Sequence, residues 1–128
     1  MSSQPIDVVR AFMKAMESLD YDTAVTHVAP DCEYINSPLG PAPSLGPQGV
    51  REVLEPFFAP VIRNEFIIRT EVVSGDVVCL ERLDRHELPK GWVELPVTGI
   101  FRVRDGKITE WRDYFDFPTI ANGFAAMS

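Results

Sequence analysis

Cysteine and histidine are both scarce in this sequence. Its 128 residues include two cysteines, Cys32 and Cys79, and two histidines, His27 and His86. The cysteines are far apart and have none of the close spacings that are typical of a metal site. Two histidines make a histidine-based metal cluster hard to assemble. We therefore expect reduced thiols and no histidine-based metal cluster.

Positive charge and long apolar runs are also lacking. Lys and Arg number 12 against 19 Asp and Glu, which gives a formal net charge of −7. This balance argues against nucleic acid or an anionic membrane as a partner, because both reward clustered basic residues. No run approaches the roughly 20 apolar residues of a membrane span, and the first residues lack the basic and apolar regions of a signal peptide. We expect a cytoplasmic protein that binds neither nucleic acid nor a membrane.

What is present is the composition of one globular domain. The chain is 45% apolar and 24% charged, which is ordinary for a folded protein, and we expect residues 1–128 to form a single domain. The first segment predicts an amphipathic helix with Ser3 as N-cap and Pro5 at an early helical position. Its apolar residues recur at helical spacing: they are Ile6, Val9, Phe12, Met13, Met16 and Leu19.

The next segments mix short elements with turns. A second short helix is expected after Asp22, and a brief strand over residues 32–36. The Pro- and Gly-rich residues 37–49 predict a loop, and a third helix should start near Pro47. Helices therefore dominate the first half of the chain.

From Glu65 onward the apolar periodicity changes from helical to strand-like. Four strand-like segments follow, and the dipeptide Asp105-Gly106 between the last two is a strong hairpin signal. Helices followed by antiparallel strands predict an α+β domain in which the helices pack on one face of a curved sheet. A cone of this kind leaves a cavity between sheet and helices, where a small molecule can bind.

Arg82 and Asp84 are the first unusual pair within the strand-like segments. Residues two apart on a strand point to the same face, about 6.6 Å apart, and Leu80 shares that face. An Arg and an Asp would then point into the core, where unpaired charge is expensive. The alternative is a structural ion pair or an exposed strand face.

Asp113 lies between two large side chains that share its strand face by period two, Trp111 and Phe115. A carboxylate in such an apolar wall has a raised pKa, which can fit it for proton transfer. The alternative is that Arg112 and Tyr114 form the inward face.

Tyr34 and Asn36 are also two apart on a predicted strand. Together they could offer a hydroxyl and an amide to hold a water molecule. The alternative is a half-buried tyrosine followed by an asparagine at the entry of a turn.

Taken together, these pairs resemble the limonene epoxide hydrolase family. The matching pieces are Tyr34-Ile35-Asn36, Glu81-Arg82-Leu83-Asp84 and the longer motif from Gly106 to Asp116, and the likeness runs from about Ile6 to Phe117. The resemblance implies a fold of the nuclear transport factor 2-like (SnoaL-like) superfamily. That fold is a curved mixed sheet, mainly antiparallel, which forms a cone closed by the N-terminal helices around a deep apolar pocket. The family is usually dimeric.

The resemblance also implies a role for each motif residue. Asp113 would be the general base and Asp84 the general acid, with Arg82 bound to both carboxylates. Tyr34 and Asn36 would hold the nucleophilic water together with Asp113. Such a site would add water to a small apolar epoxide in one concerted step and give a vicinal diol, without metal or organic cofactor.

The resemblance further implies a wall for the substrate. That wall would consist of Met13, Met16, Leu95, Val97, Phe115 and Ile120. For any one of these residues the alternative is an ordinary place in the core. His86 shares the strand face of Arg82 and Asp84 where the family would have an aliphatic residue. It either lines the pocket or is exposed because the strand ends before it, and we expect exposure.

Two rival functions stay open at this point. A ketosteroid-isomerase-like or polyketide-cyclase-like enzyme on the same fold would also use a carboxylate base in an apolar cone, but it needs no arginine between two carboxylates. A non-catalytic small-molecule binding module is the rival from another class.

The hairpin register gives a structural expectation. A two-residue turn at Asp105-Gly106 would place Thr98 opposite Asp113, whereas a three-residue loop would place Val97 there. Because the family resemblance requires an apolar neighbour, we predict the three-residue loop with Val97 opposite Asp113.

A second expectation concerns quaternary structure. We predict a two-fold homodimer, because apolar residues on alternating strand faces, Phe101 and Val103 among them, exceed what one layer of helices can bury.

Overall fold

The computed structural model describes residues 4–128, and these form helices packed against one curved sheet. The helices are α1 (Pro5–Glu17), α2 (Tyr21–Ala24), α3 (Gly46–Phe57) and α4 (Phe117–Met127), with 3₁₀ turns η1 (Val25–His27) and η2 (Ser37–Leu39). The strands are β1 (Val28–Asn36), β2 (Ser44–Leu45), β3 (Arg63–Ser74), β4 (Val77–Leu88), β5 (Gly91–Arg104) and β6 (Lys107–Tyr114). Ser3, the expected N-cap of the first helix, lies outside the described residues.

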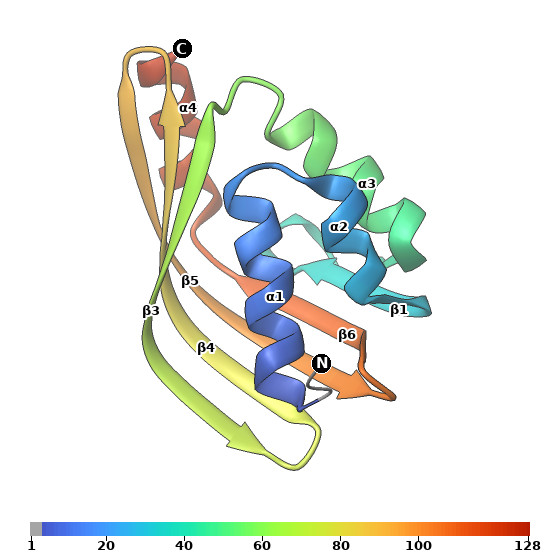
Figure 1. Cartoon of the computed structure of the whole chain (residues 1–128). Coiled ribbons are helices and arrows are strands. Elements are labelled where there is room, and N and C mark those ends of the chain that lie inside the picture. Colours follow the sequence, from blue (N-terminus) through green and yellow to red (C-terminus); the bar gives the residue numbers. More distant parts are fainter. Residues whose placement is uncertain (1–3) are drawn as a thin grey trace.

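The six strands form one mixed sheet in the order β2-β1-β6-β5-β4-β3. β1 runs parallel to β6, and every other neighbouring pair is antiparallel. The sheet curves around α1, which crosses its concave side, while α2 and α3 lie towards the β1 end and α4 lies beside the far ends of β4 and β5 (Figure 1). This arrangement confirms the predicted α+β fold with a curved, mainly antiparallel mixed sheet.

The core lies between α1 and the concave face of the sheet. α1 buries the residues that recur at helical spacing, among them Val9, Phe12 and Met16, and Pro5 occupies the first helical position, where a missing N–H costs nothing. Inward-facing residues of the long strands complete the cluster. None of the helices within residues 4–128 is long and apolar enough to cross a membrane.

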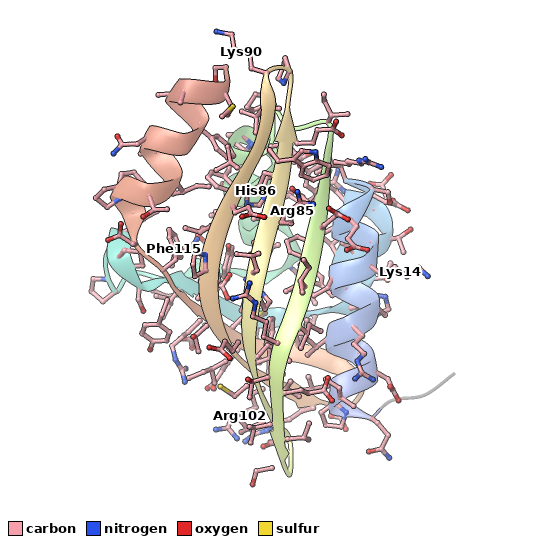
Figure 2. All side chains as sticks on the ribbon, turned by 90° about the vertical axis from the view of Figure 1, so that its left-hand side faces the viewer. Lys14, Arg85, His86, Lys90, Arg102 and Phe115 are labelled. Atoms are coloured by element: carbon pink, nitrogen blue, oxygen red, sulfur yellow. The ribbon has the colours of Figure 1, made fainter. Side chains whose placement is uncertain are left out.

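Phe101 and Val103 are 0% and 3% exposed, so both belong to this core. The expectation that these two residues need a partner chain to cover them is therefore wrong, because the sheet curves far enough for α1 to cover them. The opposite face carries ion pairs instead, including Arg85 with Glu94 and Arg102 with Asp76; both arginines are labelled in Figure 2.

The C-terminal segment differs from the strand-only expectation. β6 ends at Tyr114, and α4 begins at Phe117 after Asp116, whose carboxylate accepts a hydrogen bond from the Thr119 backbone N–H at 3.1 Å. An Asp cap followed by Pro118 near the helix start is a helix-initiation signal. The strand-like residues before it obscured that signal in the sequence.

The middle segment also holds more regular structure than a loop. Residues 37–39 form η2, residues 44–45 form β2, and α3 already begins at Gly46. The second helix starts earlier than expected, at Tyr21, because Asp20 rather than a later residue caps it by accepting from the Thr23 N–H. This helix ends at Ala24, and Val28 begins β1 after the 3₁₀ turn η1.

The predicted hairpin register is wrong. Arg104 pairs with Lys107 across a two-residue turn at Asp105 and Gly106, both with positive φ, as a type I′ turn requires. A bulge then shifts the register between Arg102 and Val103, so Gly99 lies opposite Asp113. Neither Val97 nor Thr98 takes that place, because the extra residue on β6 moves the pairing by one.

Candidate functional site

A cavity of about 190 Å³ opens between the concave face of the sheet and helices α1, α3 and α4. Its wall is mostly apolar and aromatic, with a few polar groups from β1, β4 and β6, which is the usual composition of a small-molecule site. The six residues expected to surround the substrate all line this cavity: Met13, Met16, Leu95, Val97, Phe115 and Ile120. Their role in substrate binding remains a prediction.

Arg82 joins two carboxylates at the floor of this cavity. Its Nε and Nη2 donate to the two oxygens of Asp84, each at 2.9 Å, and its Nη1 and Nη2 donate to the two oxygens of Asp113 at 3.2 and 3.1 Å. The three residues are 3%, 6% and 6% exposed. One planar guanidinium therefore binds both carboxylates in bidentate fashion, a geometry that lysine could not provide.

The strands explain how this contact forms. Arg82 and Asp84 share the inward face of β4, as period two predicts, while Asp113 lies on β6. β5 runs between these strands, and Arg82 must reach over it. The residue of β5 opposite Asp113 is Gly99, and a Cβ there would lie 2.6 Å from Arg82 Nη1 and 2.7 Å from Asp113 Oδ1.

Gly99 was missed by the sequence analysis, although a signal for it existed. A glycine inside a strand marks either a bulge or a close approach of another group to the backbone. Here the approaching group is the Arg82 guanidinium, so the missing side chain of Gly99 makes the bridge between β4 and β6 possible.

Asp113 has a further hydrogen bond that the sequence analysis missed. The Trp111 indole N–H donates to Asp113 Oδ1 at 2.8 Å, and Phe12 and Phe101 pack around the same indole. Burial raises the pKa of Asp113 above its ordinary value, against the opposing effect of the Arg82 charge. The inward face of β6 is thus that of Trp111 and Asp113.

Tyr34 and Asn36 lie beside this carboxylate because β1 pairs in parallel with β6 and places Asn36 opposite Asp113. The Tyr34 hydroxyl donates to Asn36 Oδ1 at 3.3 Å, and its ring stacks on Trp111 with 4.0 Å between centroids. Burial raises the pKa of Tyr34, so its side chain is a neutral hydroxyl at ordinary pH. Both residues line the cavity.

His86 is buried, 2% exposed, and it lines the cavity. The expectation that it would be exposed is wrong, because β4 continues to Leu88 and period two turns His86 inward. Its Nδ1 lies 2.6 Å from Asn64 Oδ1, which supplies the polar partner that a buried imidazole needs.

The structure thus brings all five residues of the predicted catalytic set to one cavity: Tyr34, Asn36, Arg82, Asp84 and Asp113. Two carboxyl groups at one guanidinium, one ionised and one protonated, form a site that can accept a proton at one oxygen and donate one at another. Within residues 4–128 no three His, Cys, Asp or Glu side chains are grouped to hold a metal ion.

The chain is similar to known epoxide hydrolases over nearly its whole length. A sequence profile of the family described as limonene-1,2-epoxide hydrolase catalytic domain matches residues 3–126. Epoxide hydrolase EphG of Mycobacterium tuberculosis is 32% identical over 123 residues, which cover 93% of this chain and 80% of that relative.

Solved structures agree with this likeness. An LEH-like epoxide hydrolase of M. tuberculosis superimposes with a TM-score of 0.78 at 31% identity, over 98% of this chain and 95% of that one. A candidate SnoaL-like polyketide cyclase of Shewanella putrefaciens superimposes with a TM-score of 0.83 over 98% of each chain, but at 19% identity. At that identity only the fold is shared, and the fold alone does not determine the reaction.

Gly99→Ala tests whether the close approach at β5 supports the site. The added Cβ would overlap Arg82 and Asp113, so both side chains must move. We expect a loss of about 1–3 kcal/mol in the free energy of unfolding and about a 10²-fold loss of turnover, the cost of a small misplacement of reacting groups.

Thr98→Ala is the matched control, because Thr98 is the preceding residue of β5 and its side chain is exposed on the opposite face. Urea unfolding and turnover should both stay near the parent values for that variant. A Gly99→Ala protein as active as the parent would contradict the assigned function of this glycine.

Proposed function

Because the chain belongs to the limonene-1,2-epoxide hydrolase family, we propose that it adds water to a small apolar epoxide in one concerted acid–base step to give a vicinal diol. The observation that carries this proposal is the buried Arg82 guanidinium bound to both Asp84 and Asp113. Opening an epoxide requires removal of a proton from water and delivery of a proton to the ring oxygen. Two carboxyl groups at one cation can do both.

In this proposal Asp113 is the general base. A water molecule placed between Asp113, Tyr34 and Asn36 would give one proton to Asp113 and attack an epoxide carbon with its lone pair. Tyr34 and Asn36 offer the complementary groups, since the Asn36 amide nitrogen can donate and the Tyr34 oxygen can accept. The raised pKa of Asp113, caused by its burial, makes it a stronger base than an exposed aspartate.

Asp84 is the general acid that protonates the epoxide oxygen as the carbon–oxygen bond breaks. In the proposed starting state Asp84 carries a proton and Asp113 is ionised. One carboxylic acid, one carboxylate and one guanidinium then give the site a net charge of zero. After turnover the proton lies on Asp113, and its return to Asp84 restores the starting state.

The rival reactions on this fold need a different site. Solved structures of similar fold include candidate polyketide cyclases, and those reactions can use a single carboxylate base. A second carboxylate held by an arginine has no task in them, which favours hydration of an epoxide. A non-catalytic binding module would not need the pair at all.

Other properties remain proposals from the sequence. They are a homodimer, which the family resemblance implies, and a cytoplasmic location. The aliphatic and aromatic wall formed by Met13, Leu95, Ile120 and their neighbours suits a substrate that is apolar around its epoxide.

A panel of cyclic and acyclic epoxides, scored for diol by chromatography, tests the proposed activity. We expect diol from at least one member. Asp113→Asn and Asp84→Asn should each lower the rate by about 10²- to 10⁴-fold, the usual contribution of one acid or base.

Asp105→Asn is the matched control, because it removes a carboxylate from the exposed turn before β6 and its positive φ suits asparagine. It should retain full activity. An Asp113→Asn enzyme with parent activity would exclude Asp113 as the base.

The pH dependence of kcat/KM tests whether Asp113 acts as an ionised base with a raised pKa. A general base works only when ionised, and the pKa of Asp113 is raised from its ordinary value of 3.8 by burial. Activity should therefore fall with decreasing pH at a midpoint above 3.8. Circular dichroism at each pH should show that the fold persists. A midpoint at or below 3.8 would contradict the assigned environment of this carboxylate.

A further inference from the structure

His86 is a polar group in a part of the cavity that is otherwise aromatic. The rings of Phe57, Phe58 and Phe124 surround its imidazole, with centroids 6.1, 5.4 and 5.8 Å away. Burying a polar group in such surroundings costs free energy unless its hydrogen bonds are made. An aliphatic or aromatic residue would fill this place at no such cost, so the imidazole requires an explanation beyond packing.

The hydrogen bonds around Asn64 determine the protonation state of the imidazole nitrogen Nδ1. The Asn64 amide Nδ2 donates to the Met16 backbone carbonyl at 3.0 Å. A carbonyl oxygen can only accept, so this bond fixes which end of the Asn64 amide carries the nitrogen. Asn64 Oδ1 must then face His86 as an acceptor, and His86 Nδ1 at 2.6 Å must carry the proton and donate to it.

The same hydrogen bonds also determine the protonation state of the other ring nitrogen, Nε2. A neutral imidazole that is protonated at Nδ1 has an unprotonated Nε2, which can only accept. Within residues 4–128 His86 Nε2 makes no hydrogen bond, whereas every fully buried side-chain nitrogen or oxygen there has a partner. Nε2 therefore has accessible surface, and the surface open to this 2% exposed residue is the cavity it lines.

We propose that His86 Nε2 is a specificity-determining acceptor that binds a hydroxyl group of the substrate. His86 follows Asp84 by two residues on the inward face of β4, about 6.6 Å further along the strand. A substrate whose epoxide oxygen meets Asp84 would then present a hydroxyl at its opposite end to His86. Figure 2 shows His86 on β4, and Phe115 where the chain leaves β6.

The electrostatics around His86 favour a substrate group that is an uncharged hydrogen-bond donor. Burial, together with the positive charge of Arg82, lowers the pKa of His86 to about 4. The imidazole is therefore uncharged near neutral pH and offers a lone pair rather than a cation. A carboxylate or phosphate on the substrate would find no partner here, whereas an alcohol would.

The substrate class rests on the proposed function, but the acceptor can be tested without turnover. Cyclohexanol and cyclohexanone are suitable probes, because they have similar size and only the alcohol donates a hydrogen bond. Calorimetry should show cyclohexanol binding about 3- to 10-fold more tightly than cyclohexanone, the effect of one hydrogen bond. His86→Leu should abolish that preference, and His27→Leu, which changes the only other histidine, should retain it.

Nitrogen NMR of the parent protein keeps the test independent of the variants' folding. With two histidines in the chain, the His86 signals are assigned by their loss in His86→Leu or by elimination with His27→Leu. The spectrum should show an unprotonated Nε2 whose shift changes on addition of cyclohexanol and not of cyclohexanone. A protonated Nε2, equal responses to both probes, or no response to either would overturn the proposal.

Turnover then separates the two proposals. Epoxycyclohexane with a ring hydroxyl opposite the epoxide should have a higher kcat/KM than epoxycyclohexane, and His86→Leu should remove the difference while epoxycyclohexane itself is still converted. If neither of these epoxides nor any other member of the panel is hydrolysed, the proposed function fails, and the binding and NMR results still decide on the acceptor. If both are hydrolysed without preference, the acceptor role of His86 fails alone.

Discussion

The ion-pair bridge from Arg82 to Asp84 and Asp113 is the interaction on which the rest of the site depends. Burying charged groups in an apolar cavity is expensive, and it is tolerable only when the partners satisfy one another closely. Here four hydrogen bonds of 2.9–3.2 Å do so. Removing one partner from such a network typically costs about 3–5 kcal/mol, because a charge is left uncompensated. The bridge therefore couples the stability of the sheet to the chemistry of the site.

The fold serves this bridge in two ways. β4 and β6 carry its members on either side of β5, and Gly99 of β5 leaves the space through which Arg82 reaches Asp113. Helices α1, α3 and α4 then cover the concave face, so apolar side chains of these helices lie across the cavity from the carboxylates. Exclusion of bulk water raises the pKa of Asp113 and strengthens each charged hydrogen bond. The buried ion-pair bridge and the apolar lining of the cavity therefore act together.

Much of the site could be predicted from the sequence because it depends on local periodicity. Period two placed Arg82 with Asp84, and Trp111 with Asp113, on common strand faces. Motif order related these pairs to one family, and that resemblance implied that the faces point inward. What failed depends on longer-range structure. The bulge in β6 shifted the hairpin register, so Gly99 was not expected beside Asp113. The extent of β4 could not be read from its residues, so His86 was placed outside the core.

The most direct test of the central claim is a single turnover in ¹⁸O-labelled water with enzyme in excess over a hydrolysable epoxide. If Asp113 activates water and Asp84 supplies the proton, the oxygen added to the diol comes from solvent in the first turnover. The account predicts one ¹⁸O atom per diol molecule and no label in the protein. Unlabelled diol from the first turnover, with ¹⁸O appearing in the carboxylate of Asp113 or Asp84 after hydrolysis, would show a covalent ester intermediate and contradict it.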